Sequence, residues 1–551
     1  MADESQDIDG SSTAGATGLL APDAGVGQVE PHDEETPLDP AVAGPPPAVG
    51  AAEPAAAPLE PTPEGPVAQA APAPASAGPA EQNTASHDLE LPSPLKELMA
   101  RGWAAPTSEL PAREPVAAST ARRRAVLTAR FAGDALVVPS GTIKVRANDT
   151  DYPYRPGSDF FWLTGCDEPD AVLVVDTSGR SVVYLADRSD RSTSAFYTDR
   201  RYGELWVGPR RGVRETEAAL DVPCRPLAEL PDALARLAPA SSRLLRGVDE
   251  RVDSRVLASE AARDEELAAV LSELRLIKDD YEIAELDAAV AATATGFAEV
   301  VRQMPAAAGL RRGERWLEGT FWRRARLDGN DVGYGSIVAC GPHATTLHWV
   351  RNDGPVVPGQ LALLDMGIER DSLYTADVTR TLPIDGRWTD AQHRVYEVVR
   401  EAQEAGLAAT RPGQDFLAPH RAAMEVIATA LDDWGILDVS AAESLRPGVG
   451  LHRRYTLHAT SHMLGLDVHD CAAARREAYR EAPLTPGMVL TVEPGLYFQA
   501  DDLTVPEELR GIGVRIEDDV LVTEDGCRNM SEALPRTADE VADWVRGLQE
   551  A

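Results

Sequence analysis

Apolar residues recur at every third or fourth position in several long stretches of the 551-residue chain, and this spacing predicts amphipathic helices. Short runs in which apolar residues are continuous, or alternate with polar ones, predict strands. The predicted helices cover residues 121–131, 278–301, 391–410 and 420–435, and the predicted strands cover 135–141, 171–176, 360–367, 487–498 and 513–523. Predicted helices and strands therefore both occur between residues 121 and 523, which predicts an α/β (α+β) fold.

The same pattern divides the chain into three segments. Residues 1–92 consist mainly of Ala, Pro, Gly and acidic side chains, and such a composition cannot bury enough apolar surface to fold, so a disordered tail is predicted. A first α/β domain is predicted over residues 93–275. Lys278, Asp279 and Asp280 predict the start of a long helix, which opens a second α/β domain over residues 276–545.

Charge excludes some kinds of partner. The chain has 53 Lys and Arg against 89 Asp and Glu, a net charge of -36, and its first 90 residues contain 16 acidic residues and no Lys or Arg. This balance argues against nucleic acid or an anionic membrane as a partner. Only three lysines occur, and no phosphate-binding G-x-x-x-x-G-K-[ST] motif is found, so chemistry that depends on a buried lysine is disfavoured.

The five cysteines are scattered without a C-x-x-C pair, which predicts free thiols in a reducing compartment. The first residues lack the basic and apolar parts of a secretory signal, and no run approaches the ~18 apolar residues of a membrane span. These features predict a soluble, cytoplasmic protein.

Histidines gather in one part of the sequence. Eight of the ten lie between His343 and His469, which favours a metal site. His458 and His462 have the i, i+4 spacing of the zinc metalloprotease motif H-E-x-x-H, but Ala459 stands where that motif has its catalytic glutamate. A zinc-protease mechanism of that kind would therefore lack its base.

Two aspartates end or begin extended runs. Asp365 ends the run QLALLD, and Asp377 precedes the run VTRT. If the runs form a hairpin centred on Asp371, the two carboxylates lie opposite each other with Cβ atoms ~5 Å apart, close enough to share cations. A turn role for either aspartate is the simpler alternative.

Two glutamates lie within apolar runs. Glu493 follows VLTV, and Glu517 lies in GVRIEDD, where strand alternation places Arg515 on the same face as Glu517. Either glutamate alone could form an ordinary cross-strand salt bridge. Together with the two aspartates and His462, they favour a shared site.

The chain resembles aminopeptidase P, the Xaa-Pro aminopeptidases of the pita-bread metallopeptidases, over residues 125–530. The resemblance rests on motifs that occur in the family's order: YPYRPGSDFFWLTG, LHWV, LLDMG, TADVTRT, HATSHMLGLDVHD, LTVEPGLY and GIGVRIEDD. It implies a creatinase-like N-terminal α/β domain followed by a pita-bread catalytic domain. Without it, the aromatic residues of 152–162 would be assigned to core packing at least as readily as to a cleft.

Carried over position by position, the resemblance implies metal ligands at Asp365, Asp377, His462, Glu493 and Glu517. This oxygen-rich set suits hard or borderline divalent ions. The family usually binds two Mn²⁺ ions, and Asp377 and Glu517 are expected to help bridge them.

Further roles follow from the same resemblance. His348 and His469 match histidines that hold the substrate carbonyl and the tetrahedral intermediate, and His458 matches one nearer the proline. Arg515 and Tyr334 match groups that orient the ligand carboxylates. Trp206 matches a tryptophan that reaches a neighbouring subunit's active site, which implies a homodimer or homotetramer. The segment His458-Ala-Thr-Ser-His462 departs from the more usual His-Gly-Leu-Ser-His at two positions that are not ligands.

The implied reaction is release of the first residue from peptides with proline in second position. A hydroxide that bridges two metal ions attacks the scissile carbonyl, and Glu493 moves the proton to the departing nitrogen. Two alternatives stay open: a prolidase that cleaves only Xaa-Pro dipeptides, and a catalytically inactive pita-bread module that binds peptides.

Overall fold

The computed structural model describes residues 91–104, 109–256 and 260–550. The predicted tail, residues 1–92, lies outside these ranges except for its last two residues. Among the described helices, none is long and apolar enough to cross a membrane. All five cysteines fall within the described ranges and are free thiols, as predicted.

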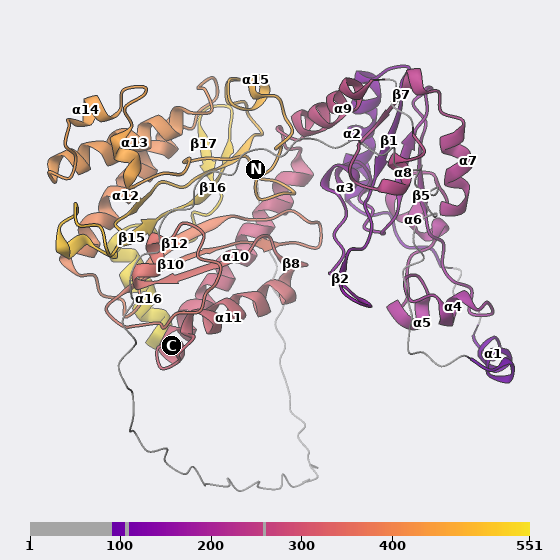
Figure 1. The fold of residues 1–551 in the computed structure, drawn as a ribbon, viewed down its shortest axis with the longest axis horizontal. Coiled ribbons are helices and arrows are strands. Elements are labelled where there is room, and N and C mark those ends of the chain that lie inside the picture. Colours follow the sequence, from indigo (N-terminus) through magenta and orange to yellow (C-terminus); the bar gives the residue numbers. More distant parts are fainter. Residues whose placement is uncertain (1–90, 105–108, 257–259, 551) are drawn as a thin grey trace, which may run out of the picture. The chain divides into compact units, whose positions relative to one another are not determined.

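The first domain is built on a five-stranded mixed sheet in the order β6-β5-β4-β1-β7 (Figure 1). Its central strands β1 and β4 match the predicted runs and are fully buried. The strands are β1 (Ala135–Pro139), β2 (Val145–Ala147), β3 (Thr150–Asp151), β4 (Val172–Val175), β5 (Ser181–Leu185), β6 (Cys224–Pro226) and β7 (Ser242–Leu244). The helices are α1 (Ser93–Met99), α2 (Val116–Arg130), α3 (Ser158–Thr164), α4 (Ala195–Thr198), α5 (Glu204–Val207), α6 (Val213–Leu220), α7 (Leu230–Ala235), α8 (Glu250–Asp253) and α9 (Ala261–Leu274).

The aromatic segment 152–162 contributes to the core of this domain. Phe160, Phe161 and Trp162 of α3 are buried in one cluster with Leu136 and Leu173 of the central strands. Tyr152 is exposed. The core-packing interpretation of this segment is therefore confirmed for its phenylalanines and its tryptophan.

A capped helix opens the second domain. Asp279 accepts a hydrogen bond from the Glu282 backbone, and the Glu282 side chain accepts one from the Asp279 backbone, which forms a capping box at the predicted helix start. The helices are α10 (Asp280–Ala307), α11 (Gly313–Asp328), α12 (Asp390–Ala409), α13 (Ala418–Asp433), α14 (Ala441–Ser444), α15 (Arg476–Tyr479) and α16 (Ala538–Glu550).

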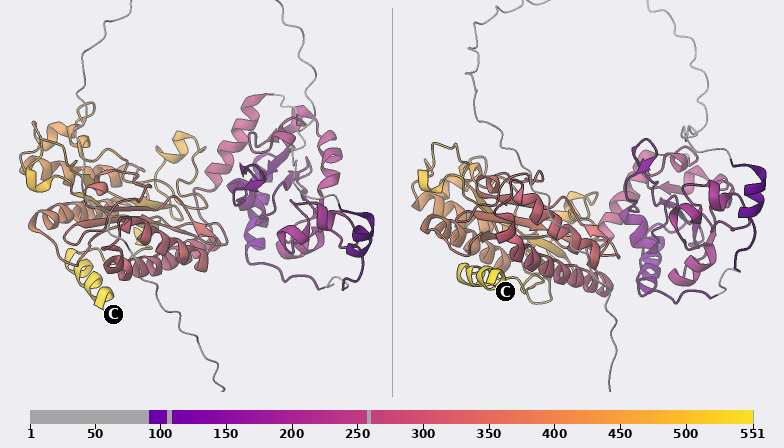
Figure 2. Two further views of the ribbon diagram at one scale, coloured as in Figure 1. Left: turned by 60° about the horizontal axis from the view of Figure 1, so that its bottom comes forward. Right: turned by 90° about the horizontal axis from the view of Figure 1, so that it is seen from below.

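The strands of this domain form small antiparallel sheets, of which β12-β10-β9 and β13-β16-β17 are the larger. They are β8 (Asp331–Val332), β9 (Ile337–Cys340), β10 (Leu361–Met366), β11 (Ile368–Glu369), β12 (Val378–Pro383), β13 (Val489–Val492), β14 (Gly495–Tyr497), β15 (Gly513–Arg515), β16 (Asp518–Val522) and β17 (Cys527–Asn529). Helices α10 and α11 pack together, as do α12 and α13, and α16 lies along α10 (Figure 2).

The apolar faces of these helices meet the sheet in one core. Phe297 of α10 and Phe321 of α11 pack edge to face, with ring centroids 6.2 Å apart. Both are fully buried in one cluster with Leu364 of β10 and Val378 of β12. Since β10 and β12 are buried along their whole length, the carboxylates at their ends are set on a rigid support.

Candidate metal centre and substrate pocket

A cavity of about 960 Å³ in the second domain gathers the residues singled out in the sequence. Its lining residues lie between Tyr334 and Glu517. The structure brings together in it ten of the eleven candidate residues: Tyr334, His348, Asp365, Asp377, His458, His462, His469, Glu493, Arg515 and Glu517. Trp206, in the first domain, is not among the residues that line this cavity.

The two aspartates lie on a hairpin, but the predicted centre of that hairpin is wrong by one residue. Asp365 pairs with Thr379, and Glu369 pairs with Thr375, so the hairpin is centred on Ser372. Its turn includes Leu373 in a left-handed conformation (φ 63°). Asp377 is therefore a diagonal neighbour of Asp365 on one face and not its direct partner, and the Cβ atoms of diagonal neighbours are typically somewhat less than about 7–8 Å apart.

Glu517 reaches the same place from a distant part of the chain. It forms a bridge with Thr379, in which the Glu517 backbone donates to the Thr379 carbonyl at 3.0 Å. The Thr379 hydroxyl also donates to the Glu517 carboxylate at 2.6 Å. The predicted alternation is confirmed, because Arg515 and Glu517 line the cavity while Val514 and Ile516 are buried in the core.

His462 completes the cluster of acidic side chains. Its Nε2 lies 3.3 Å from an Asp377 oxygen and 3.6 Å from a Glu493 oxygen. Among the described residues, Asp377, His462 and Glu517 offer ligand atoms that all lie within 4.8 Å of one another. His458 and His462 do not lie on a helix, so their i, i+4 spacing does not reflect the geometry of H-E-x-x-H proteases.

The electrostatics of the cluster fit a cation. Burial raises the pKa of Glu517 well above its ordinary value, and the charges of Asp377 and Glu493 raise it further. Burial lowers the pKa of His462, but its hydrogen bond to Asp377 and the charge of Glu493 outweigh this effect and raise it to about 9. Three buried carboxylates and the partly buried Glu493 thus attract positive charge beyond that of Arg515, and oxygen donors with one imidazole suit a divalent ion.

Asp365 is oriented by two neighbours that the resemblance implied. Tyr334 donates its hydroxyl proton to one oxygen at 2.6 Å, and Arg515 donates to the other. The Arg515 guanidinium also donates to Tyr497 at 3.0 Å, and the Tyr497 hydroxyl lies 2.8 Å from His458 Nε2. A chain of hydrogen bonds therefore connects Asp365 to His458.

Sequence reasoning missed Tyr497. Strand alternation offered a signal, because residues 493, 495 and 497 share a face. Gly495 makes the arrangement possible, since a Cβ there would lie 2.1 Å from the Tyr497 hydroxyl. The glycine of VEPGLY thus gives the phenol room to fold back along the strand.

The other two histidines lie on irregular segments. The His469 ring meets the His462 ring edge to face at 4.4 Å, and burial together with the charge of His462 lowers the pKa of His469. The next residue, Asp470, is buried and accepts hydrogen bonds from Arg275 and Lys278. His348 follows a short 3-10 turn, Gly341–Thr345, and lines the cavity.

Two family models match the chain: "Aminopeptidase P, N-terminal domain" over residues 120–245 and "Metallopeptidase family M24" over residues 284–524. Xaa-Pro aminopeptidase 1 of Streptomyces coelicolor is 52% identical and covers 83% of this chain and 92% of its own length. Xaa-Pro aminopeptidase of Escherichia coli is 33% identical, over 76% of this chain and 95% of its own. The structure of E. coli aminopeptidase P with the inhibitor Pro-Leu matches with a TM-score of 0.69 at 30% identity, over 80% of this chain and all of the other.

The chain belongs to the aminopeptidase P family. Its two predicted folded domains contain the two matched regions, and the pita-bread fold implied by the resemblance is confirmed.

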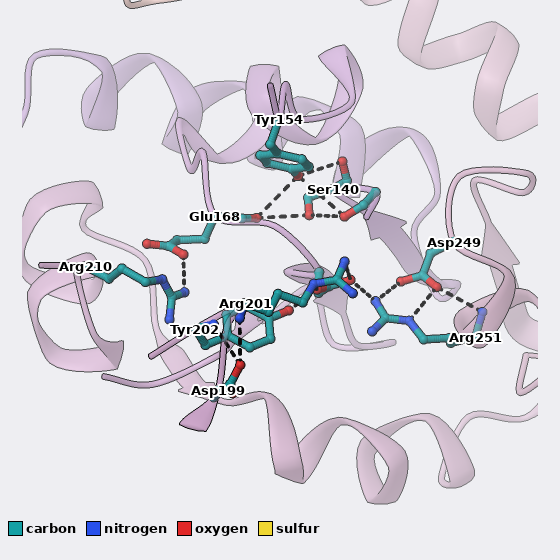
Figure 3. Close-up of polar contacts among 11 residues, drawn as sticks. Ser140, Tyr154, Glu168, Asp199, Arg201, Tyr202, Arg210, Asp249 and Arg251 are labelled. Carbon is teal, nitrogen blue, oxygen red and sulfur yellow. Dashed lines mark hydrogen bonds and ion pairs between the residues drawn. The ribbon is translucent and has the colours of Figure 1, made fainter. Parts of the chain in front are cut away.

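In this aminopeptidase P chain the segment that carries Trp206 is tied to the first domain by an ionic network (Figure 3). Asp199 accepts hydrogen bonds from the backbones of Arg201 and Tyr202 at 2.8 and 3.0 Å, and Arg210 pairs with Glu168. Trp206 remains 50% exposed, with Leu205 and Val207 exposed beside it. The Trp206 indole itself donates to the Tyr197 carbonyl at 2.8 Å, and this contact orients an exposed apolar group at the surface of the first domain.

Proposed function

We propose that this chain is a metal-dependent Xaa-Pro aminopeptidase, which releases the N-terminal residue from peptides with proline in second position. The observation that carries the proposal is the convergence of four carboxylates, three of them buried and Glu493 partly buried, with His462 in one cavity that three further histidines border. Its membership of the aminopeptidase P family and its 52% identity to an Xaa-Pro aminopeptidase support the substrate class.

We propose that Asp365, Asp377, His462, Glu493 and Glu517 would hold two divalent ions, and that Asp377 and Glu517 would contribute to the binding of both. Asp377 and Glu517 both belong to the group whose ligand atoms lie within 4.8 Å of one another, which supports this arrangement. We propose Mn²⁺ because carboxylates dominate the set. E. coli aminopeptidase P, a structural neighbour, has been obtained in a Zn-substituted form in complex with product.

When bound, such ions would supply a nucleophile at neutral pH, because they lower the pKa of bound water to about 7. Glu493 is the proposed group that accepts the proton and passes it to the departing nitrogen. His348 and His469 are proposed to donate to the carbonyl oxygen as its charge develops. His458, held by Tyr497, is proposed to lie nearer the proline ring.

The test is release of the first amino acid from an Xaa-Pro-Yaa tripeptide by protein that has been stripped with a chelator and reloaded with Mn²⁺. The matched control peptide is Xaa-Ala-Yaa. Cleavage of only the proline peptide, and only after reloading, is the expected result. Cleavage of an Xaa-Pro dipeptide but not of the tripeptide would establish a prolidase, and cleavage of neither by loaded protein would establish a binding module.

Two further expectations stay proposals. The exposed Trp206 suits contact with another copy of the chain in a homodimer or homotetramer, and a monomer in sedimentation at micromolar concentration would contradict it. A cytoplasmic location fits the five free thiols. Reducing conditions should accordingly leave the activity unchanged.

A further inference from the structure

Glu314, in α11, is a fully buried carboxylate that collects four hydrogen bonds. One oxygen accepts from the Cys340 backbone at 2.9 Å and lies 2.8 Å from His343 Nδ1. The other accepts from the Trp349 indole at 2.9 Å and from the Gly354 backbone at 2.6 Å. An ionised carboxylate only accepts, so His343 carries its proton on Nδ1 in this arrangement.

All four donors belong to one segment, residues 340–354, which leaves β9 and carries His348 midway. Glu314 binds the segment at its start, at His343 and Trp349, and at its end. The Glu314 backbone also donates to the Gly354 carbonyl at 3.1 Å. The buried carboxylate therefore holds several parts of an irregular loop together through hydrogen bonds.

The packing of the loop leaves little freedom around this point. The His343 and Trp349 rings stack with centroids 3.9 Å apart. A Cβ at Gly354 would lie 2.4 Å from the His343 ring and 2.9 Å from the Glu314 carboxylate, so only glycine fits there. Asn352, also fully buried, bonds to the Val338 backbone and to the Ser336 carbonyl.

The loop has two sides. Leu347, His348 and Val350 line the cavity, whereas Trp349 turns away from it and donates to Glu314. Glu314 thus contacts the segment on the side that faces away from the cavity, whereas His348 lies on the side that faces the cavity.

We propose that Glu314 is a positioning residue that holds His348 at a fixed position relative to the metal centre. The inference rests on the role proposed above for His348. A displacement of about 1 Å in a group that must meet a transition state can cost about 100-fold in rate, so a rigid support behind His348 has a kinetic effect without touching the substrate.

The first test is Glu314→Gln. The amide nitrogen replaces an acceptor with a donor that faces two N–H groups, so the loop must shift. We expect kcat for Xaa-Pro-Yaa to fall about 10- to 100-fold, with two Mn²⁺ still bound per chain. The matched control is Asp264→Asn, which alters a buried carboxylate that accepts from the Leu244 backbone in the first domain and should leave kcat unchanged.

The second test combines Glu314→Gln with His348→Ala. If Glu314 acts through His348, the double variant is no slower than His348→Ala alone. Equal fold losses from Glu314→Gln in both backgrounds would overturn the inference but leave the role of His348 intact. An unchanged kcat in His348→Ala would overturn that role, and the inference with it.

A milder variant covers the case in which Glu314→Gln does not fold. Trp349→Phe removes one donor and keeps a ring to stack on His343. It should lower kcat about 5-fold, and this loss should vanish in the His348→Ala background. A loss that persists there, or no loss in the single variant, would contradict the proposal.

Discussion

The two sides of the cavity are built in different ways. On one side, Asp365, Asp377 and Glu517 lie on or next to paired strands, and backbone hydrogen bonds such as that from Glu517 to Thr379 set their positions. On the other side, His348 and His469 lie on irregular segments. Buried polar side chains from elsewhere hold those segments, Glu314 behind His348 and Arg275 with Lys278 beside Asp470.

The difference separates binding of the cation from alignment of the substrate. A carboxylate on a paired strand keeps its place without help from distant side chains, because the ladder is cooperative. A histidine on a loop depends on a few polar contacts, each of which one substitution can remove. The strand side should therefore govern metal content, and the loop side should govern kcat at full metal content.

Replacement of a strand carboxylate should have the largest effect. Asp377→Ala removes a proposed ligand between the two ions, so bound Mn²⁺ should fall below two per chain and activity should fall at least about 1,000-fold. Metal analysis and tripeptide cleavage measure the two quantities. Asp415→Asn, in a turn outside the cavity, is the matched control. Two bound Mn²⁺ per chain in Asp377→Ala would contradict the assignment of metal binding to the strand side of the cavity.

Replacement of a loop histidine should have the next largest effect. His469→Ala should lower kcat about 100- to 1,000-fold, the cost of losing one donor to a developing oxyanion, with two Mn²⁺ retained. His393→Ala, which alters an exposed histidine of α12, serves as the control. Loss of metal in His469→Ala would instead show that His469 contributes to metal binding.

Tyr497→Phe should have a smaller effect, because it removes only the link between Arg515 and His458. We expect a loss of about 10- to 100-fold in kcat/KM. Tyr455→Phe alters a buried tyrosine of the same domain whose hydroxyl contacts Thr504, and should change little. Equal losses in both variants would show a general packing effect.

A change in pH should have the smallest effect, and this effect should be on metal affinity. His462, with a pKa raised to about 9, and Glu517, with a raised pKa, hold protons in the metal-free protein that a cation must displace. Metal affinity should therefore rise with pH up to about 9, by about tenfold per pH unit for each proton released. Calorimetry in buffers of different ionisation enthalpy measures the release, and affinity independent of pH would contradict it.

Much of the strand side was predictable from the sequence. The apolar runs that end in Asp365 or continue into Glu493 and Glu517 are local signals, and alternation correctly placed Arg515 beside Glu517. The predicted register of the hairpin was wrong by one residue, because Leu373 in the turn adopts a left-handed conformation that a leucine does not indicate in a sequence.

The supports of the loop side were not predictable. Glu314 lies 34 positions before His348, at the start of an amphipathic helix where a glutamate is ordinary. Lys278 and Asp470 are almost 200 positions apart. Contacts of this kind arise from tertiary packing and leave no period or motif in the sequence.

The most direct test of the account is anomalous diffraction from crystals of the Mn²⁺-loaded protein. The account predicts two peaks among Asp365, Asp377, His462, Glu493 and Glu517, with Asp377 and Glu517 between them and His348, His458 and His469 outside coordination distance. A single peak, or a peak ligated by one of those three histidines, would contradict the division of the cavity into a strand side that binds metal and a loop side that aligns the substrate.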